Sequence, residues 1–246
     1  MPSTLWTDLL LGAAGFVSSV INVIAGGGSF LTLPILIFLG LPATDANATN
    51  RVGVVVQNVG AVWAFHRHRV LDWRAGMGMA VPAMLGAGFG TWLALLVGDR
   101  DFRRILAVAM LALTLWTLVD PTGRATGALR DRPWTVRGAF LLVGVYSGFL
   151  QAGVGFLVLA LTTLAGLDLV RGNAVKVLTI LLPTALSLAI FSWTGHVRWL
   201  DAVWLSVGSL LGSLVGVRLT VLRGHRFVRT VVTVTIVVLA VRLWFP

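Results

Sequence analysis

The chain has 246 residues, of which 57% are hydrophobic and only 11% are charged, and its formal net charge is +10. Its apolar segments are too long and too frequent for a soluble core, so the composition excludes an ordinary soluble domain and indicates a membrane protein. The absence of cysteine excludes disulfides and thiolate metal ligands.

The apolar segments predict helices. Residues 231–241 are apolar on every face, whereas the strands of a membrane β-barrel would alternate apolar and polar residues. We therefore expect an all-α polytopic membrane protein. The first 24 residues contain no Lys or Arg, so we expect no cleavable signal peptide. In chain order, the expected helices are at about 4–24, 30–39, 47–65, 73–97, 102–119, 134–150, 156–165, 173–193, 200–222 and 227–244.

Two of these segments, 30–39 and 156–165, are predicted to be half-helices. At 1.5 Å per residue they are too short to cross a hydrocarbon core of about 30 Å. Each follows a glycine-rich stretch, "GGG" at Gly26 to Gly28 and "GVG" at Gly153 to Gly155. The glycines therefore mark places where an apolar helix is interrupted.

The two halves of the chain repeat each other. One constant shift pairs Gly27 with Gly153 and Asn47 with Asn173 without a gap. The same shift pairs Phe30 with Phe156, Gly40 with Gly166, Ala48 with Ala174, Trp73 with Trp199, Gly86 with Gly212 and Gly90 with Gly216. We predict a first membrane repeat at 1–119, a cytoplasmic linker at 120–133 and a second membrane repeat at 134–246.

The loop arginines favour one topology. If each glycine break is a re-entrant hairpin, the loops at 66–74, 120–137, 168–172 and 223–229 share a side and hold most of the loop arginines. If the broken segment crosses the membrane once, the cations divide almost evenly, so the positive-inside rule favours the hairpin. Each repeat is then a re-entrant hairpin plus three transmembrane helices. An odd number of crossings makes the repeats inverted, with both termini outside, as in many secondary transporters.

A glycine break at membrane depth is tolerated only where protein or a water-filled cavity satisfies its backbone. Its freed N–H groups and the N-terminus of the following half-helix attract an anion, and glycine permits close approach. The alternative is that the glycines only allow helices to pack closely, which is our interpretation of Gly86, Gly88 and Gly90.

Polar residues gather near the two breaks, and ionisable groups inside a membrane are expensive enough to be functional candidates. Lys176 occupies the repeat position of Asn50, so we expect it to point towards the centre and to supply charge for an anion. Arg51 has two readings, a functional cation or a side chain that snorkels to the interface. The candidate substrate-binding residues are Asn22, Gly26, Gly27, Gly28, Ser29, Asn47, Asn50, Arg51, Gln57, Gln151, Gly153, Gly155, Asn173 and Lys176.

The distribution of acidic residues indicates which substrates the chain is not expected to transport. There is no Glu, and every Asp maps to an expected loop or helix end. Transporters of protons and cations usually keep a carboxylate within the membrane. An anion route therefore fits better than a route for a metal or an organic cation.

The stretches "AGGGSFLTLPILIFLGLPATDANATNRVG" and "SGFLQAGVGFLVLALTTLAGLDLVRGNAVKVL" resemble the sulfite exporter TauE/SafE family of membrane permeases. The resemblance covers nearly the whole chain. It implies a multi-pass inner-membrane permease for a sulfur oxyanion or an organosulfonate. The second half departs from the family pattern, with Gly-Val-Gly at 153–155 and Asn-Ala-Val-Lys at 173–176.

Enzymatic readings fit poorly. Ser147 and His196 would lie at opposite depths of the membrane. His66 and His68 lie two positions apart in an arginine-rich loop, which is more typical of a solvated turn than of a metal site. We expect no catalytic residue, metal or cofactor. The expected partners are a small anionic substrate and the lipid bilayer, with no nucleic acid, since the arginines suit anionic lipid.

Some alternatives stay open. They are a permease for a small carboxylate, a membrane scaffold that transports nothing, and a homodimer. The identity of the anion, the direction of transport and the coupling ion are not defined by the sequence.

Overall fold

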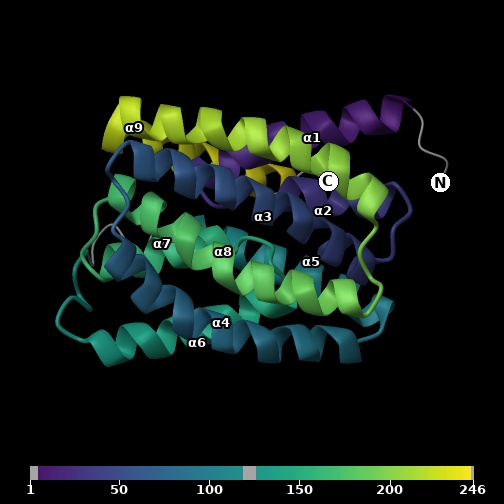
Figure 1. Ribbon diagram of the computed structural model, residues 1–246, viewed down its shortest axis with the longest axis horizontal. Helices are drawn as coiled ribbons and strands as arrows, with labels where there is room; N and C mark the ends of the chain where they lie inside the picture. Colours follow the sequence, from purple (N-terminus) through teal and green to yellow (C-terminus); the bar gives the residue numbers. More distant parts are fainter. Residues whose placement is uncertain (1–4, 119–125, 245–246) are drawn as a thin grey trace.

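The computed structural model describes residues 5–118 and 126–244, and all of its regular structure in this part of the chain is helical (Figure 1). The helices are α1 (Leu5–Ile24), α2 (Ser29–Phe38), α3 (Ala43–Arg67), α4 (Trp73–Leu96), α5 (Asp99–Leu118), α6 (Pro133–Phe149), α7 (Val154–Leu164), α8 (Leu169–Trp193) and α9 (Trp199–Trp244). The short helices α2 and α7 are the two predicted half-helices. Residues 120–125 of the predicted linker lie outside the described residues.

Helices α3 and α8 begin a full turn earlier than the sequence analysis expected. Helix α8 begins at Leu169 rather than near 173, because the Asp168 side chain accepts hydrogen bonds from the Val170 and Arg171 N–H groups. Helix α3 begins at Ala43 rather than near 47, directly after Pro42. Asn residues favour helix starts, so Asn47 and Asn173 gave a misleading signal. Both asparagines lie one turn inside their helices.

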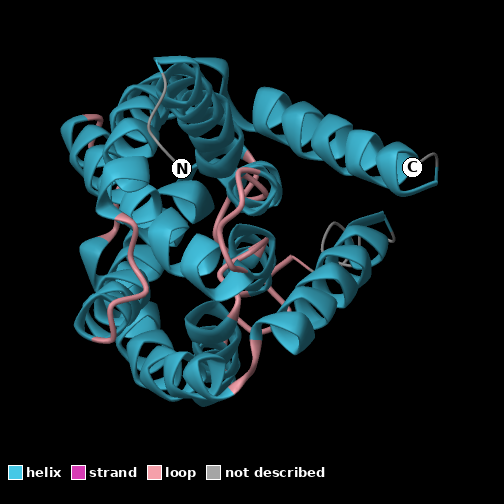
Figure 2. Cartoon of the chain, turned by 90° about the vertical axis from the view of Figure 1, so that its right-hand side faces the viewer, coloured by secondary structure: helices cyan, strands magenta, loops and turns pink. Residues whose placement is uncertain are grey.

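Helix α9 contains the two C-terminal segments that were predicted as separate helices. They meet at Gly224, whose φ of +67° and ψ of −161° are not helical. Glycine adopts this region without the steric cost that other residues would bear. Figure 2, viewed from the right-hand end of Figure 1, shows the last segment extending to one side of the bundle.

The most extensive contacts between helices join the two predicted repeats. Helix α1 packs along α9, and α4 packs along α6, so the first helix of each half lies against the fourth helix of the other half. Glycines make both contacts close. A Cβ atom added at Gly208 would lie 1.9 Å from the Gly12 carbonyl oxygen, and one at Gly90 would lie 2.0 Å from that of Val145. Small residues spaced four apart commonly allow this approach in membranes.

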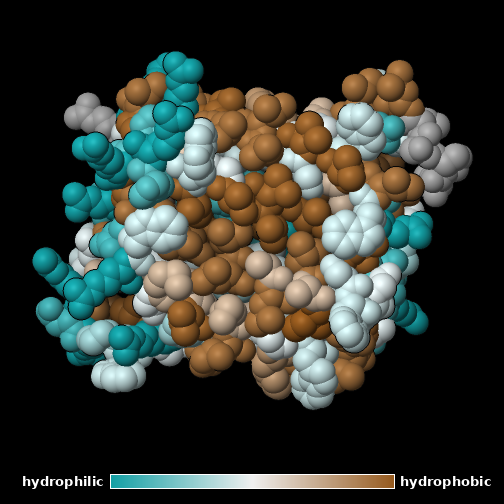
Figure 3. Space-filling view, in the orientation of Figure 1, coloured by the Kyte–Doolittle hydropathy of each residue, from teal (hydrophilic) through white to brown (hydrophobic). Residues whose placement is uncertain are grey.

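The surface of the bundle is that of a membrane protein. In the view of Figure 3 a broad hydrophobic band crosses the middle, and hydrophilic residues gather mainly at the left end. The α3–α4 loop lies at that left end in Figure 1, whereas the α2–α3 and α8–α9 loops lie at the right end. Among the described residues, four helical segments are long and apolar enough to cross a membrane: α1, α4, α8 and residues 199–224 of α9.

We predict that Gly90→Ala destabilises the fold, because its new Cβ would press against the Val145 backbone of α6. Overpacking of this kind costs about 1–3 kcal/mol. Gly88→Ala is the matched control. Its Cβ would meet Leu186 Cδ2 at an ordinary 3.6 Å, and alanine favours the helix by up to about 1 kcal/mol.

The measurement is the thermal unfolding midpoint of both variants in detergent. A lower midpoint for Gly90→Ala and an unchanged or higher one for Gly88→Ala is expected. Equal midpoints would show that close packing of α4 on α6 is not what Gly90 provides.

Candidate functional site

The two glycine breaks meet backbone to backbone inside the protein. Gly26 has a φ of +103°, and a Cβ added there would lie 2.3 Å from the Gly155 carbonyl carbon. A Cβ added at Gly155 would lie 2.4 Å from the Gly26 Cα atom. Since neither position has room for a side chain, glycine is required at both. We call this contact the glycine crossing.

Two phenylalanines pack reciprocally around the glycine crossing. The rings of Phe30 and Phe156 have their centroids 6.0 Å apart. A Cβ added at Gly27 would lie 2.5 Å from the Phe156 ring, and one added at Gly153 would lie 2.6 Å from the Phe30 ring. Each half therefore contributes the same glycine and the same ring to the contact.

The N-termini of both half-helices lie beside the glycine crossing. Helix α2 starts at Ser29, three residues after Gly26, and α7 starts at Val154, directly before Gly155. Gly155 was expected before this helix but lies in its first turn. Helix N-termini carry partial positive charge and unpaired N–H groups. The crossing thus brings together two ends that attract anions.

Arg51, from α3 of the first half, reaches the end of α6 in the second half. Its side chain is fully buried. One terminal nitrogen donates to the carbonyl oxygens of Ser147 (3.0 Å) and Gly148 (2.6 Å), and the other donates to Gln151 Oε1 (2.9 Å). The guanidinium carbon also lies 5.1 Å from the centroid of the Phe191 ring. Arg51 is therefore not a snorkelling residue.

Gln151 holds an unusual backbone conformation in the second break. Its φ is +62°, a region that residues other than glycine rarely adopt. The side chain is buried and held at both ends, because Oε1 accepts from Arg51 and Nε2 donates to Thr184 Oγ1 at 3.1 Å. These contacts fix the turn that leads from α6 into Gly153.

Lys176, from α8 of the second half, reaches the end of α1 in the first half. Its buried ammonium donates to the carbonyl oxygens of Asn22 (2.8 Å) and Val23 (2.9 Å). An ammonium has three donors, and these two carbonyls take two of them. The sequence analysis placed this charge near the helix N-termini, whereas its bonds go to the helix end that precedes the first break.

Two asparagines repeat the same arrangement. Asn173 Nδ2 donates to the Ile24 carbonyl oxygen, and Asn47 Nδ2 donates to that of Phe149, both at 3.0 Å. The last carbonyls of a helix lack partners within the helix. A cation and an amide from each half therefore satisfy the broken helix of the other half.

The remaining candidates divide into two groups. Asn50 belongs to the first break, because its Nδ2 donates to Ser29 Oγ at 3.3 Å and its Oδ1 accepts from Thr32 Oγ1 at 2.6 Å. Gly28 also belongs there, packed against the Ser18 carbonyl and Asn22. Gln57 is buried, and its Nε2 has no hydrogen-bond partner.

Four candidates carry buried polar atoms that have no hydrogen-bond partner. They are Asn47 Oδ1, Arg51 Nε, Gln57 Nε2 and Asn173 Oδ1. In folded proteins the great majority of buried polar groups have a hydrogen-bond partner, so each unpaired atom requires an explanation. A polar centre that holds water or a substrate would supply the missing partners.

The sequence analysis missed several polar neighbours of Arg51. Thr91 Oγ1 lies within hydrogen-bonding distance of the Gly148 carbonyl oxygen (3.2 Å) and of Ser187 Oγ (2.7 Å). The Gly148 carbonyl oxygen is also an acceptor of Arg51. Thr184, Ser187 and Phe191 lie three or four positions apart along α8. That spacing places them on one helical face, a signal in the sequence that could have identified them.

An all-helical membrane bundle with two broken helices and a buried polar centre defines a class of membrane transporters. Comparison with known proteins gives the family. Residues 11–243 match the family described as Sulfite exporter TauE/SafE, so the chain belongs to this family.

Relatives of similar length carry general names. A "Probable membrane transporter protein" from Haemophilus influenzae is 29% identical over 238 residues, which cover 92% of this chain and 91% of the relative. "Probable membrane transporter protein YfcA" from Escherichia coli is 29% identical over 246 residues, with 97% and 91% covered. "Probable membrane transporter protein ORF9" from Sinorhizobium sp is 26% identical over 236 residues, with 95% and 90% covered. No solved structure matches the chain.

We predict that Arg51→Lys destabilises the protein although it keeps the positive charge. A single ammonium cannot reproduce the planar fork that spans Gln151 and two carbonyls. Loss of charged hydrogen bonds to buried acceptors costs about 1–3 kcal/mol. Arg218→Lys, at an exposed position of α9, is the control and should change little.

Thermal unfolding of both variants in detergent, without added anion, measures the effect. If Arg51→Lys unfolds at the same temperature as the parent protein, the guanidinium fork does not hold the end of α6.

Proposed function

We propose that this chain is a secondary transporter for a small anion, which binds near the membrane midplane between the N-termini of α2 and α7. The observation that carries the proposal is the glycine crossing, where the backbones of Gly26 and Gly155 touch beside the N-termini of both half-helices. Because a helix N-terminus carries partial positive charge, both half-helices would attract an anion to this place.

The buried charges support an anion rather than a cation. Among the described residues, the buried charged side chains are Arg51 and Lys176, and both are cations. In a low-dielectric interior a fixed charge attracts an opposite charge far more strongly than in water. A transported cation would face two like charges.

We further propose a sulfur oxyanion or an organosulfonate as the substrate, bound by the candidate residues around the two breaks. The description of the matched family, Sulfite exporter TauE/SafE, supports this class. The general names of the relatives are equally compatible with a small carboxylate, which is the second candidate. Both classes present oxygen atoms to N–H donors.

The repeats are, in this proposal, inverted in the inner membrane, each with a re-entrant hairpin and three transmembrane helices. The reciprocal packing of Phe30 and Phe156 and the exchange of helix contacts between the halves support a two-fold relation. The arginine-rich α3–α4 loop lies at one end of the bundle, which we assign to the cytoplasm (Figure 1). Rocking of one repeat against the other would then expose the crossing to either side.

An anion-binding screen tests the function. Purified protein is titrated with sulfite, sulfate, thiosulfate, a short sulfonate and a small carboxylate, with chloride as the control. One of the oxyanions should bind, and Lys176→Gln should weaken its binding by about 1–3 kcal/mol through loss of a charged partner. Lys176→Arg should retain part of the affinity, because it retains the charge.

The variants also separate binding from structure. If Lys176 only caps α1, Lys176→Gln will lower the unfolding temperature and leave the anion affinity unchanged. If no anion of the panel binds the parent protein more tightly than chloride does, the proposed function is wrong.

A labelling experiment tests the topology. A cysteine introduced as Ala128→Cys, in the segment between α5 and α6, should be shielded from an impermeant thiol reagent added outside intact cells. It should react after the membrane is made permeable, because the positive-inside rule places this segment in the cytoplasm. The parent chain has no cysteine, so the signal has no background. Labelling from outside intact cells would contradict the inverted arrangement.

A further inference from the structure

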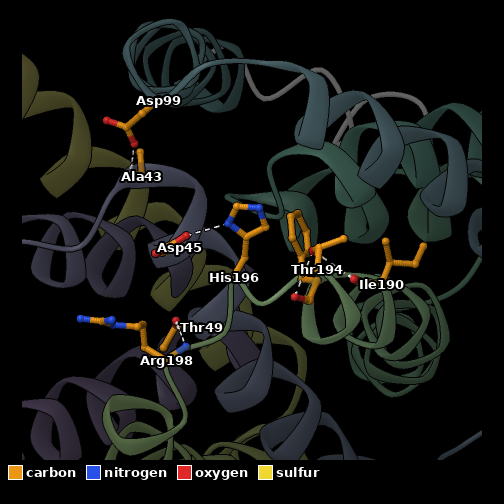
Figure 4. A network of polar contacts seen from close by, with 9 residues as sticks. Ala43, Asp45, Thr49, Asp99, Ile190, Thr194, His196 and Arg198 are labelled. Atoms are coloured by element: carbon orange, nitrogen blue, oxygen red, sulfur yellow. Dashed lines mark hydrogen bonds and ion pairs between the residues drawn. The ribbon is translucent and has the colours of Figure 1, made fainter.

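Three polar contacts tie the start of α3 to other elements at the right-hand end of the bundle (Figure 4). The Ala43 N–H donates to the Asp99 carboxylate of α5. Asp45 Oδ1 lies 2.8 Å from His196 Nδ1, and Thr49 Oγ1 accepts from the Arg198 N–H at 3.0 Å. His196 and Arg198 belong to the α8–α9 loop. Two of these contacts, those of His196 and Arg198, therefore hold the two predicted repeats together at this end.

The pair of His196 and Asp45 differs from the other ion pairs among the described residues. Those three pairs join residues that lie three or four positions apart within one half. His196 and Asp45 lie 151 positions apart and join α8–α9 to α3. A change in this one pair can therefore act on the closure between the halves.

The histidine is connected to the candidate substrate site through one aromatic ring. The rings of His196 and Phe191 meet edge to face, with centroids 6.2 Å apart. Phe191 is fully buried, and Arg51 lies against the same ring. Phe191 thus stands between the His196 end of the protein and the buried guanidinium.

Water reaches the pair although Phe191 behind it is buried. The side chains of His196 and Asp45 are 35% and 23% exposed. Histidine is the side chain whose charge ordinarily changes between pH 5 and 8. A half-exposed histidine beside a carboxylate is a site that protons can enter and leave from one side of the protein.

Several other charged groups lie at this end of the protein. Asp99 of α5 pairs with Arg103 as well as with the Ala43 N–H. Arg198 extends away from His196 in Figure 4, and Arg51 lies on the other side of Phe191. Asp201 lies in the first turn of α9. Asp45 is the carboxylate that His196 contacts.

The positions where transporters often bind sodium are occupied by side chains here. In transporters with broken helices, C-terminal carbonyls of half-helices coordinate the coupling cation. In this protein Arg51 and Lys176 bind the corresponding carbonyls at the ends of α6 and α1. A sodium ion at either place would lie next to a fixed positive charge.

We propose that the pair of His196 and Asp45 is a proton-binding site that controls access to the substrate site from the right-hand end of the bundle. The protonated imidazole and the ionised carboxylate hold α8–α9 against α3 and keep this end closed. As pH rises and the histidine loses its proton, the charge attraction is lost and this end opens more often. Its role in transport rests on the proposed function, but the closure itself does not.

Labelling of a buried cysteine tests the proposal. Ala46 follows Asp45 and is fully buried in the apolar cluster that includes Phe191. The rate at which a small polar thiol reagent labels Ala46→Cys is measured from pH 5.5 to 8.5 in purified protein without anion. The same cysteine is then measured together with His196→Gln, so that the pH dependence of the thiol itself cancels in the comparison.

The expected result is a rate that rises more steeply with pH when His196 is present, by about two- to fivefold over this range, as suits a partly exposed ion pair. His196→Gln should remove that extra rise, and Asp45→Asn serves as a second variant with the same expectation. His68→Gln, at an exposed histidine of the α3–α4 loop, should leave it unchanged.

The proposal is overturned if the labelling rate rises equally steeply with pH in the presence of His196 and in His196→Gln, or if Asp45→Asn keeps the full extra rise. The measurement requires no anion. Failure of the anion screen with an intact pH response would therefore refute the proposed substrate and leave the proton site standing.

Discussion

A helix that ends in the buried interior of a protein leaves its last carbonyl groups without donors, so other parts of the chain must supply them. The rest of the structure depends on how this protein meets that constraint twice. The ends of α1 and α6 both receive a cation and an amide, and in both cases these donors come from the opposite half of the chain. The same exchange brings the two glycine breaks together at Gly26 and Gly155. Satisfying the backbone and building the polar centre are thus one arrangement.

The two helix ends are satisfied by similar amides but by different cations. Asn47 and Asn173 occupy equivalent positions of the predicted repeat, and each donates to the last carbonyl of a helix. Lys176, however, is equivalent to Asn50, which bonds to Ser29 and Thr32 instead of a helix end. Arg51 lies one residue further along α3, and its fork reaches three acceptors where the lysine reaches two. The helix ends at the two breaks are therefore satisfied by different cations with different numbers of hydrogen bonds, so the two halves are not identical around the polar centre.

Much of this fold could be predicted from local sequence, and the site only in part. The glycine breaks, the short helices after them and the family follow from patterns that neighbouring residues define. The helix starts at Ala43 and Leu169 were missed because Asn47 and Asn173 look like caps but donate to distant carbonyls. The partners of Arg51 lie about 100 positions away, so no local pattern reveals them. Gly88 was grouped with Gly86 and Gly90, yet only the latter two meet another backbone.

Because the donors for the end of α1 come from the second half of the chain, the order in which the protein is synthesised matters. The Asn22 carbonyl oxygen accepts a hydrogen bond from Lys176, which lies 154 positions later in the chain and is synthesised after it. At about 5–20 residues per second, a ribosome needs roughly 8–30 s to cover that distance. During this interval the first break has been synthesised but lacks its lysine, so a temporary partner such as water, lipid headgroups or the insertion machinery must serve the exposed carbonyls. The final assembly of α1 is therefore tied to the late arrival of α8.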